Sequence, residues 1–195
     1  MIWIILGHLI MFGFHAMANK SHYYTMGDEV LIEFINNPTF PVDTFLFISG
    51  FLSTYNFLKE QQKMKRITSI TGRTNIFLQK LMKRYIRLTP AYFVVILIAI
   101  LNFTWHDHTS AILPFEHPSA KCSKYWWTNI LYINNFYKWD DLCLIWSWYL
   151  PNDTQFFVFG IFLLLLSITH YNIAVGIGVA ALVSSIGSVA YTGYS

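Results

Sequence analysis

The chain has 195 residues, of which 55% are hydrophobic, 18% aromatic and only 12% charged, with a formal net charge of +3. Soluble domains carry about twice this share of charged residues, so the composition excludes an ordinary soluble fold and favours a membrane protein. The sequence contains no nucleotide-binding loop, no cluster of metal ligands and no nucleic-acid module. We therefore expect no bound cofactor, no metal site and no nucleic-acid partner.

Five stretches stay apolar over about the length that a helix needs to cross a bilayer, which is roughly 20 residues. They are residues 2–17, 41–58, 90–105, 154–169 and 172–191. We expect an all-α fold, a polytopic transmembrane helix bundle with about five spans and one interfacial amphipathic helix.

Basic residues concentrate between Lys59 and Arg87, where nine of the thirteen Lys and Arg residues of the chain are opposed by a single acid. Because short loops rich in Lys and Arg stay on the cytosolic side, segment 59–89 is predicted to be cytosolic. Alternation of the spans then places segments 18–40 and 106–151 on the lumenal or extracellular side, the second as a long loop.

Two features of the predicted lumenal segments agree with this orientation. Asn19 begins an Asn-Lys-Ser glycosylation sequon, and the only two cysteines, Cys122 and Cys143, fall in one lumenal segment. An oxidising compartment would let these cysteines form a disulfide, whereas the alternative is two free thiols in an apolar chain.

The interfacial helix is predicted from residue 76 to 88, where apolar and basic side chains alternate with helical period. Thr89 suits a helix cap and Pro90 a first helical position, so one helix is expected to end here and a spanning helix to begin. Arg84 and Arg87 project from the basic face. They are either anchors that pair with anionic lipid headgroups or an anion site that grips a phosphate bidentately.

His8 lies within the first apolar stretch, near the middle of the predicted span. An ionisable residue at this depth is a candidate functional group, and the alternative is a neutral histidine bonded to its own helix. The stretch could also be a signal peptide, because residues 16–18 form an Ala-x-Ala site. No Lys or Arg precedes the apolar run, as such a peptide would require.

Five motifs carry a resemblance to a known family. In chain order they read "IWIILGH", "VDTFLFISGFL", "RYIRLTPAY", "WWTNILYINNFY" and "CLIWSWYLPNDTQFF". Together they resemble the animal nose-resistant-to-fluoxetine branch of the acyltransferase-3 family of multi-span membrane O-acyltransferases. The match covers residues 2 to about 160, and the order and spacing of the motifs make it specific.

The resemblance implies transfer of an acyl group from a cytosolic acyl-CoA, as co-substrate, to a hydroxyl of an acceptor. His8 matches the family's first-helix histidine, and Arg84 and Arg87 match its R-x-x-R pair. The arginines would hold the phosphates of the donor while its long arm reaches the membrane. His8 would then deprotonate the acceptor hydroxyl or briefly accept the acyl group.

Further matching residues are implied in supporting roles. Asp153 and Gln155 stand where family members place an acidic residue and a glutamine, and Asp153 would orient or charge-balance the reacting group; the alternative for Asp153 is a favourable acid at a helix start. Asp43 and Ser49 match another family segment, for which helix capping and close packing are the alternative.

The sequence also departs from the family, which has about twice as many spans and an arginine eleven positions before its histidine. We expect residues 1–195 to be part of a longer acyltransferase-3-like domain whose missing spans contact the small-residue face of the last helix. Membrane lipids are expected partners, in the endoplasmic reticulum or the plasma membrane. Two other functions stay open: uptake or transport of a lipid or small molecule, and a non-catalytic membrane interaction protein.

Overall fold

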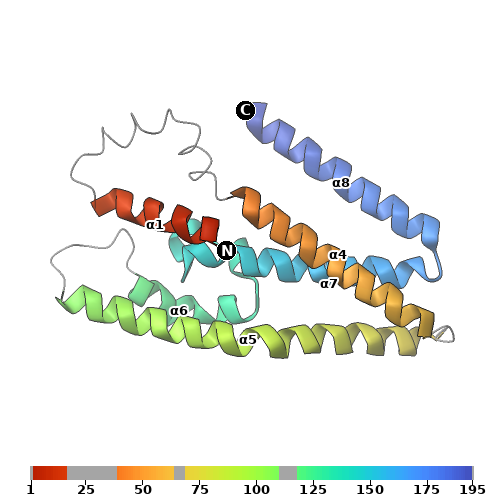
Figure 1. Ribbon diagram of the computed structural model, residues 1–195, viewed down its shortest axis with the longest axis horizontal. Helices are drawn as coiled ribbons and strands as arrows, with labels where there is room; N and C mark the ends of the chain where they lie inside the picture. The colour runs from red at the N-terminus through yellow and green to blue at the C-terminus, as the bar shows by residue number, and fades with distance from the viewer. Residues whose placement is uncertain (1, 17–38, 64–68, 110–117, 195) are drawn as a thin grey trace.

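The computed structural model describes residues 2–16, 39–63, 69–109 and 118–194 (Figure 1). Six α-helices lie in these ranges: α1 (Ile2–Ala16), α4 (Thr39–Lys63), α5 (Ile70–Thr109), α6 (Pro118–Ile130), α7 (Tyr149–Ser167) and α8 (Tyr171–Tyr194). Three short 3₁₀ turns link α6 to α7: η1 (Asn134–Phe136), η2 (Trp139–Asp141) and η3 (Ile145–Trp148). The described ranges contain no strand, which confirms the predicted all-α fold.

Helix α5 is continuous for 40 residues, or about 60 Å, and contains Pro90 in its interior. The predicted helix break at Thr89 is therefore wrong. A proline inside a helix removes one backbone hydrogen bond and costs about 3 kcal/mol, so packing has to hold the two halves in line. Residues on both sides of the proline, Leu88 before it and Tyr92 after it, pack against the same hydrophobic cluster. This shared cluster explains why local sequence preference does not end the helix.

Three of the described helical segments are long and apolar enough to cross a membrane: residues 70–106, 145–167 and 171–194. Helices α1 and α4 correspond to the predicted spans 2–17 and 41–58 but are not among the three. Helix α1 has only 15 residues, and α4 carries serine, threonine and asparagine side chains along its length. The polar residues of α4 contribute to the candidate site described below.

The bundle is built around α7, which packs most extensively against α4 and α8 (Figure 1). A buried cluster of Phe57, Ile161 and Leu165 joins α4 to α7, with Phe77 of α5 packed against it. Contacts of α5 with α7 join early residues of one helix to late residues of the other, so these two helices run antiparallel. Their antiparallel arrangement brings the basic half of α5 alongside α7.

Residues 118–148 form a folded cap where the sequence predicted a long loop. Helix α6 packs along the C-terminal half of α5, and the 3₁₀ turns continue from it to α7. A disulfide joins Cys122 of α6 to Cys143, and both cysteines are fully buried against Tyr92 and Ile96 of α5. The disulfide agrees with the sequence prediction, and it fixes the cap to the helix that carries the basic residues.

Candidate functional site

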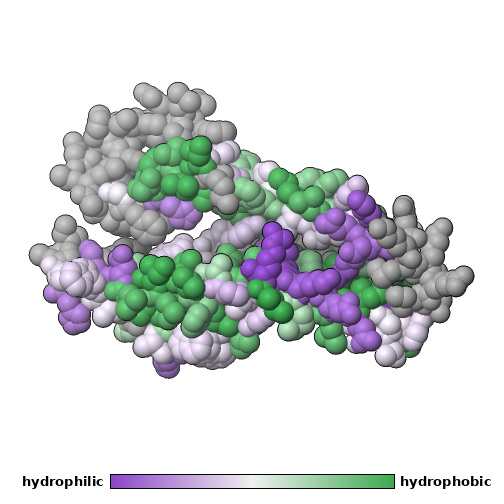
Figure 2. All heavy atoms as spheres, turned by 60° about the horizontal axis from the view of Figure 1, so that its bottom comes forward, coloured by the Kyte–Doolittle hydropathy of each residue, from purple (hydrophilic) through white to green (hydrophobic). Residues whose placement is uncertain are grey.

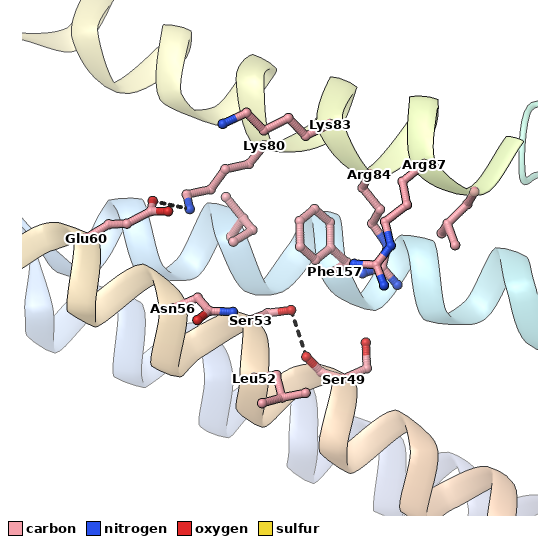
Figure 3. A pocket seen from close by; sticks show the side chains of 12 residues that line it. Ser49, Leu52, Ser53, Asn56, Glu60, Lys80, Lys83, Arg84, Arg87 and Phe157 are labelled. Carbon is pink, nitrogen blue, oxygen red and sulfur yellow. Dashed lines mark hydrogen bonds and ion pairs between the residues drawn. The ribbon is translucent and has the colours of Figure 1, made fainter.

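A cleft of about 520 Å³ lies between α4, α5 and α7 (Figure 3). Helix α4 contributes one wall with polar side chains, α5 contributes four cations, and α7 contributes an aromatic floor. The lining residues are Ser49, Leu52, Ser53, Asn56, Glu60, Lys80, Lys83, Arg84, Arg87, Leu88, Phe157 and Ile161. Figure 2 shows the corresponding hydrophilic band over the N-terminal half of α5 and the end of α4, between hydrophobic surfaces.

Helical spacing explains why all four cations of α5 reach one cleft. Residues three, four and seven positions apart lie on one face of a helix, and this is the spacing of Lys80, Lys83, Arg84 and Arg87. The apolar residues between them face the opposite side of α5, where Tyr85 packs against the hydrophobic cluster beneath the cap. The amphipathic pattern recognised in the sequence therefore builds the site.

Arg84 forms an ion pair with Asp153 of α7, and the side chains are only 18% and 13% exposed. The guanidinium of Arg84 also lies over the ring of Phe157, 4.5 Å from its centroid. A charge-assisted hydrogen bond and a cation–π contact together fix the orientation of this side chain. The Nε atom of Arg84 is buried and has no hydrogen-bond partner among the described residues. Arg84 therefore retains a donor for a further acceptor.

Lys80 repeats this arrangement one helical turn earlier. Its ammonium donates a hydrogen bond of 2.6 Å to Glu60 of α4 and lies 5.6 Å from the centroid of the Phe57 ring. Glu60 is 52% exposed, so this pair is weaker than the buried pair at Arg84. Two of the four cations in the cleft are thus matched by a carboxylate.

Lys83 and Arg87 are the two cations of the cleft that no carboxylate of the described residues compensates. Both are exposed, and within the described ranges neither makes a hydrogen bond or an ion pair. In Figure 3 the side chain of Arg87 points from α5 toward α7, beside Arg84. Four cations against two carboxylates leave the cleft with two uncompensated positive charges. Such a site attracts an anion, and the planar fork of Arg87 suits a phosphate.

The Arg84–Asp153 pair corrects the depth predicted for its two residues. The predicted boundaries put Arg84 at the cytosolic end of span 90–105 and Asp153 at the lumenal end of span 154–169, a bilayer apart. In the structure the two side chains are in contact, so both residues lie at one depth and the two boundaries cannot both hold. Hydropathy locates apolar runs, but it does not say how far one long helix is displaced along its neighbour.

The depth of the cleft follows from a second contact between α5 and the end of α7. The guanidinium of Arg73 donates a hydrogen bond of 2.8 Å to Thr169, in the turn between α7 and α8. From Thr169 to Asp153 the chain rises about 24 Å along α7, at ~1.5 Å per residue. The ion pair beside the cleft therefore lies well inside the bundle, where a charged pair is a candidate functional site by default.

His8 lies on α1, and the described residues that line the cleft do not include it. Its Nδ1 atom is 2.8 Å from the carbonyl oxygen of Ile4. A carbonyl can only accept a hydrogen bond, so in the neutral form of the ring Nδ1 carries the proton and Nε2 the lone pair. The structure does not join His8 to Arg84 or Asp153.

The remaining predicted residues fall in different places. Ser49 lines the cleft, whereas Asp43 is exposed on α4 and is not among the described lining residues. Gln155 exchanges hydrogen bonds of 2.9 Å with Asn135 and donates one of 3.0 Å to the carbonyl of Tyr132. Gln155 thus holds the turn after α6, in which Tyr132 adopts a φ of 57°.

The predicted glycosylation site, Asn19, lies outside the described residues.

Comparison with known proteins identifies the family to which the chain belongs. A family model described as an acyltransferase domain, of the acyltransferase-3 type, matches residues 1–194. The chain belongs to the acyltransferase-3 family. It is 32% identical over 189 residues to nose resistant to fluoxetine protein 6 of Caenorhabditis elegans. This alignment covers 92% of the chain and 22% of the relative, so the chain spans about a fifth of that protein's length.

Membership of this family, together with the long apolar helices, identifies the chain as an integral membrane protein of a membrane acyltransferase family. No solved structure matches the chain. The resemblance inferred from the five motifs is thus confirmed over the whole chain, while the roles of single residues rest on the geometry above.

The sequence did not predict a buried polar network that lies within the cap between α5 and α7. The side-chain amide of Asn129 donates hydrogen bonds to the hydroxyls of Tyr92, at 2.7 Å, and Ser147, at 3.1 Å. Asn129, Asn134 and Ser147 are at most 4% exposed. The asparagines belong to the motif "WWTNILYINNFY", but a polar residue beside two tryptophans gives no local signal that it will be buried. Through the hydrogen bond to Tyr92, the network connects the cap to α5.

Proposed function

We propose that the chain supplies the donor site of a membrane O-acyltransferase that moves an acyl group from a cytosolic acyl-CoA to a hydroxyl of a lipid, sugar or other acceptor. One observation carries this proposal: a cleft with two uncompensated cations leads to a buried ion pair between α5 and α7. An acyl-CoA combines clustered phosphates with a long arm, so it matches a cationic entrance followed by a deep interior.

In this proposal Arg87 and Lys83 bind the phosphates. Arg84 contributes its Nε–H group, which makes no hydrogen bond to Asp153. Arg84 keeps the phosphate-binding role implied by the R-x-x-R resemblance, although the ion pair already holds one of its nitrogens. Its fixed orientation lets it bind a phosphate oxygen without first losing side-chain freedom. Arg87, which is exposed and has no ion-pair partner among the described residues, is the side chain that reorients when the ligand binds.

The proposed reaction uses His8 as general base. The acceptor oxygen attacks the thioester carbonyl carbon while Nε2 of His8 takes the hydroxyl proton. The carbon–sulfur bond then breaks, and coenzyme A leaves as the thiol after it receives that proton. Because His8 lies on α1, which contacts α4 but does not line the cleft, the thioester has to reach the α4 side of the cleft for His8 to act.

The test is binding of radiolabelled octanoyl-CoA to the full chain in lipid nanodiscs. Arg87→Ala should weaken binding roughly ten- to hundredfold, because it removes a charge-assisted contact. Lys121→Ala is the matched control, since it removes one positive charge from α6, away from the cleft. Adenosine 3′,5′-bisphosphate should compete with octanoyl-CoA if the cleft recognises the nucleotide phosphates.

Equal affinity of the two alanine variants would contradict the donor site. If octanoyl-CoA binds but no acceptor releases coenzyme A thiol, the uptake or transport function takes the place of acyl transfer. The proposed compartment is the endoplasmic reticulum or the plasma membrane. In both, the cytosolic side offers acyl-CoA.

A further inference from the structure

A second, smaller chamber of about 80 Å³ lies between α4 and α7, beside the cationic cleft. The chamber shares Ser49, Ser53 and Phe157 with the lining of the cleft, so it is a side chamber of the same site. Asp153 lines the chamber and is paired with Arg84 of the cleft. The carboxylate of Asp153 therefore lies at the boundary between the two spaces.

The chamber offers hydrogen-bond acceptors at a site without positive charge of its own. Asp153 uses Oδ2 for Arg84, and no described residue donates a hydrogen bond to its Oδ1. The hydroxyl of Ser53 donates its proton to the carbonyl of Ser49 at 2.7 Å, so the Ser53 oxygen can act only as an acceptor toward a ligand. A group that binds beside Asp153 and Ser53 has to donate a proton, as an alcohol does.

The size of the chamber limits what part of an alcohol can enter. A water molecule occupies about 30 Å³ in the liquid, so the space holds two or three atoms of water size. A hydroxymethyl group fits, whereas a sugar ring or a tertiary carbinol does not. The walls carry glycines at positions 50 and 160, and a Cβ added at either would meet no atom within 4 Å. Each of the two glycines therefore has room for a larger side chain.

We propose that this chamber is the acceptor subsite, in which Asp153 accepts the hydrogen bond of a primary hydroxyl while the donor occupies the adjoining cleft. The inference rests on the proposed acyl transfer and adds the class of acceptor, an unbranched hydroxymethyl group. The acceptor oxygen forms the new ester bond as the thioester carbon–sulfur bond breaks. The hydroxyl proton passes to His8, on the helix that contacts α4, and from His8 to the coenzyme A thiolate.

The experiment separates the acceptor subsite from the donor site. The full chain in nanodiscs is given radiolabelled octanoyl-CoA as donor and either 1-butanol or tert-butanol as acceptor, and donor affinity is measured in parallel. Transfer to 1-butanol should be at least about tenfold faster than to tert-butanol, because extra methyl groups in a small pocket discriminate by this order. Gly160→Leu should keep the octanoyl-CoA affinity and lose transfer to 1-butanol at least about tenfold.

Gly187→Leu on α8 is the matched control, because a Cβ there also meets no atom within 4 Å but Gly187 is not among the residues that line either space. Gly160→Ala, which adds a single methyl group, should give an intermediate rate and serves if the leucine variant does not fold. Wild-type transfer by Gly160→Leu or Gly160→Ala, or equal rates with the two alcohols, overturns the acceptor subsite and leaves the donor site in place. Wild-type protein that binds octanoyl-CoA and does not acylate 1-butanol also overturns it. Failure of the wild-type protein to bind octanoyl-CoA overturns the proposed function and this inference together.

Discussion

Arg84 of α5 and Asp153 of α7 are 69 positions apart in the chain, yet their side chains form a buried ion pair that sets the relative depth of the two helices. Removing one partner leaves a partly buried charge without compensation, which is more destabilising than never having the pair. The pair thus locks α5 against α7 and at the same time defines the inner end of the cationic cleft.

The first prediction tests this lock. Asp153→Asn should lower the free energy of unfolding by about 2 kcal/mol or more, because Arg84 stays charged in a site that is 18% exposed. Thermal unfolding in detergent, followed by circular dichroism, measures the loss. Glu60→Gln is the control. Glu60 is the exposed acid of the pair with Lys80, so its substitution should lower the free energy of unfolding by less than about 1 kcal/mol. Equal losses in the two variants would contradict a structural role for the deeper pair.

The second prediction concerns Pro90, which lies inside a continuous helix. Pro90→Ala should raise the free energy of unfolding by about 1 kcal/mol or more, because alanine restores the missing backbone hydrogen bond and adopts the same backbone conformation. Helical content should stay constant in circular dichroism. If helical content instead increases clearly, two separate helices were joined by the substitution, and the break predicted from the sequence was right.

The third prediction concerns the disulfide between Cys122 and Cys143. In denaturant, both cysteines should resist alkylation until a reductant is added, and Cys122→Ser should make Cys143 reactive without reductant. The bridge closes a loop of 21 positions, so its loss should lower stability by roughly 3 kcal/mol. Labelling of both thiols in protein that has not been reduced would exclude the bridge.

The fourth prediction tests which side of the membrane the cleft faces. The chain has two cysteines, and the disulfide occupies both, so an introduced thiol is unique. Arg87→Cys should react with a charged, membrane-impermeant thiol reagent from the same side as Thr71→Cys, because Arg87 lines a cleft that extends from the basic end of α5. A cysteine at Ser119 should react only from the opposite side. Reaction of the Arg87 and Ser119 positions from one side would contradict the proposed cytosolic entry.

The helices and the cationic face could be predicted from the sequence because both depend on local periodicity. Lys80, Lys83, Arg84 and Arg87 share one face of any helix that they form, whatever packs against it. What those cations contact could not be predicted. The carboxylate of Asp153 and the ring of Phe157 come from a distant helix, and local sequence does not encode how far two helices are displaced along each other.

The errors at the helix boundaries have the same origin. Thr89 and Pro90 carry a strong local signal for a helix break, but the hydrophobic cluster shared by Leu88 and Tyr92 outweighs it. The hydroxyl of Thr89 contacts that of Tyr132, 3.3 Å away, instead of capping a new helix. Tertiary packing decides such sites, so a single sequence predicts the elements of this bundle better than their ends.

The last prediction separates catalysis from binding at His8. His8→Gln keeps a side chain that can donate a hydrogen bond to the carbonyl of Ile4, but the amide cannot act as a base. Transfer from octanoyl-CoA should fall at least about a hundredfold, the usual contribution of a general base, while octanoyl-CoA affinity stays within about twofold of wild type. His108→Gln, at the exposed end of α5, is the matched control and should leave both quantities unchanged. Transfer at the wild-type rate by His8→Gln would make His8 a structural residue of α1, and the proton acceptor would then have to come from another part of the protein.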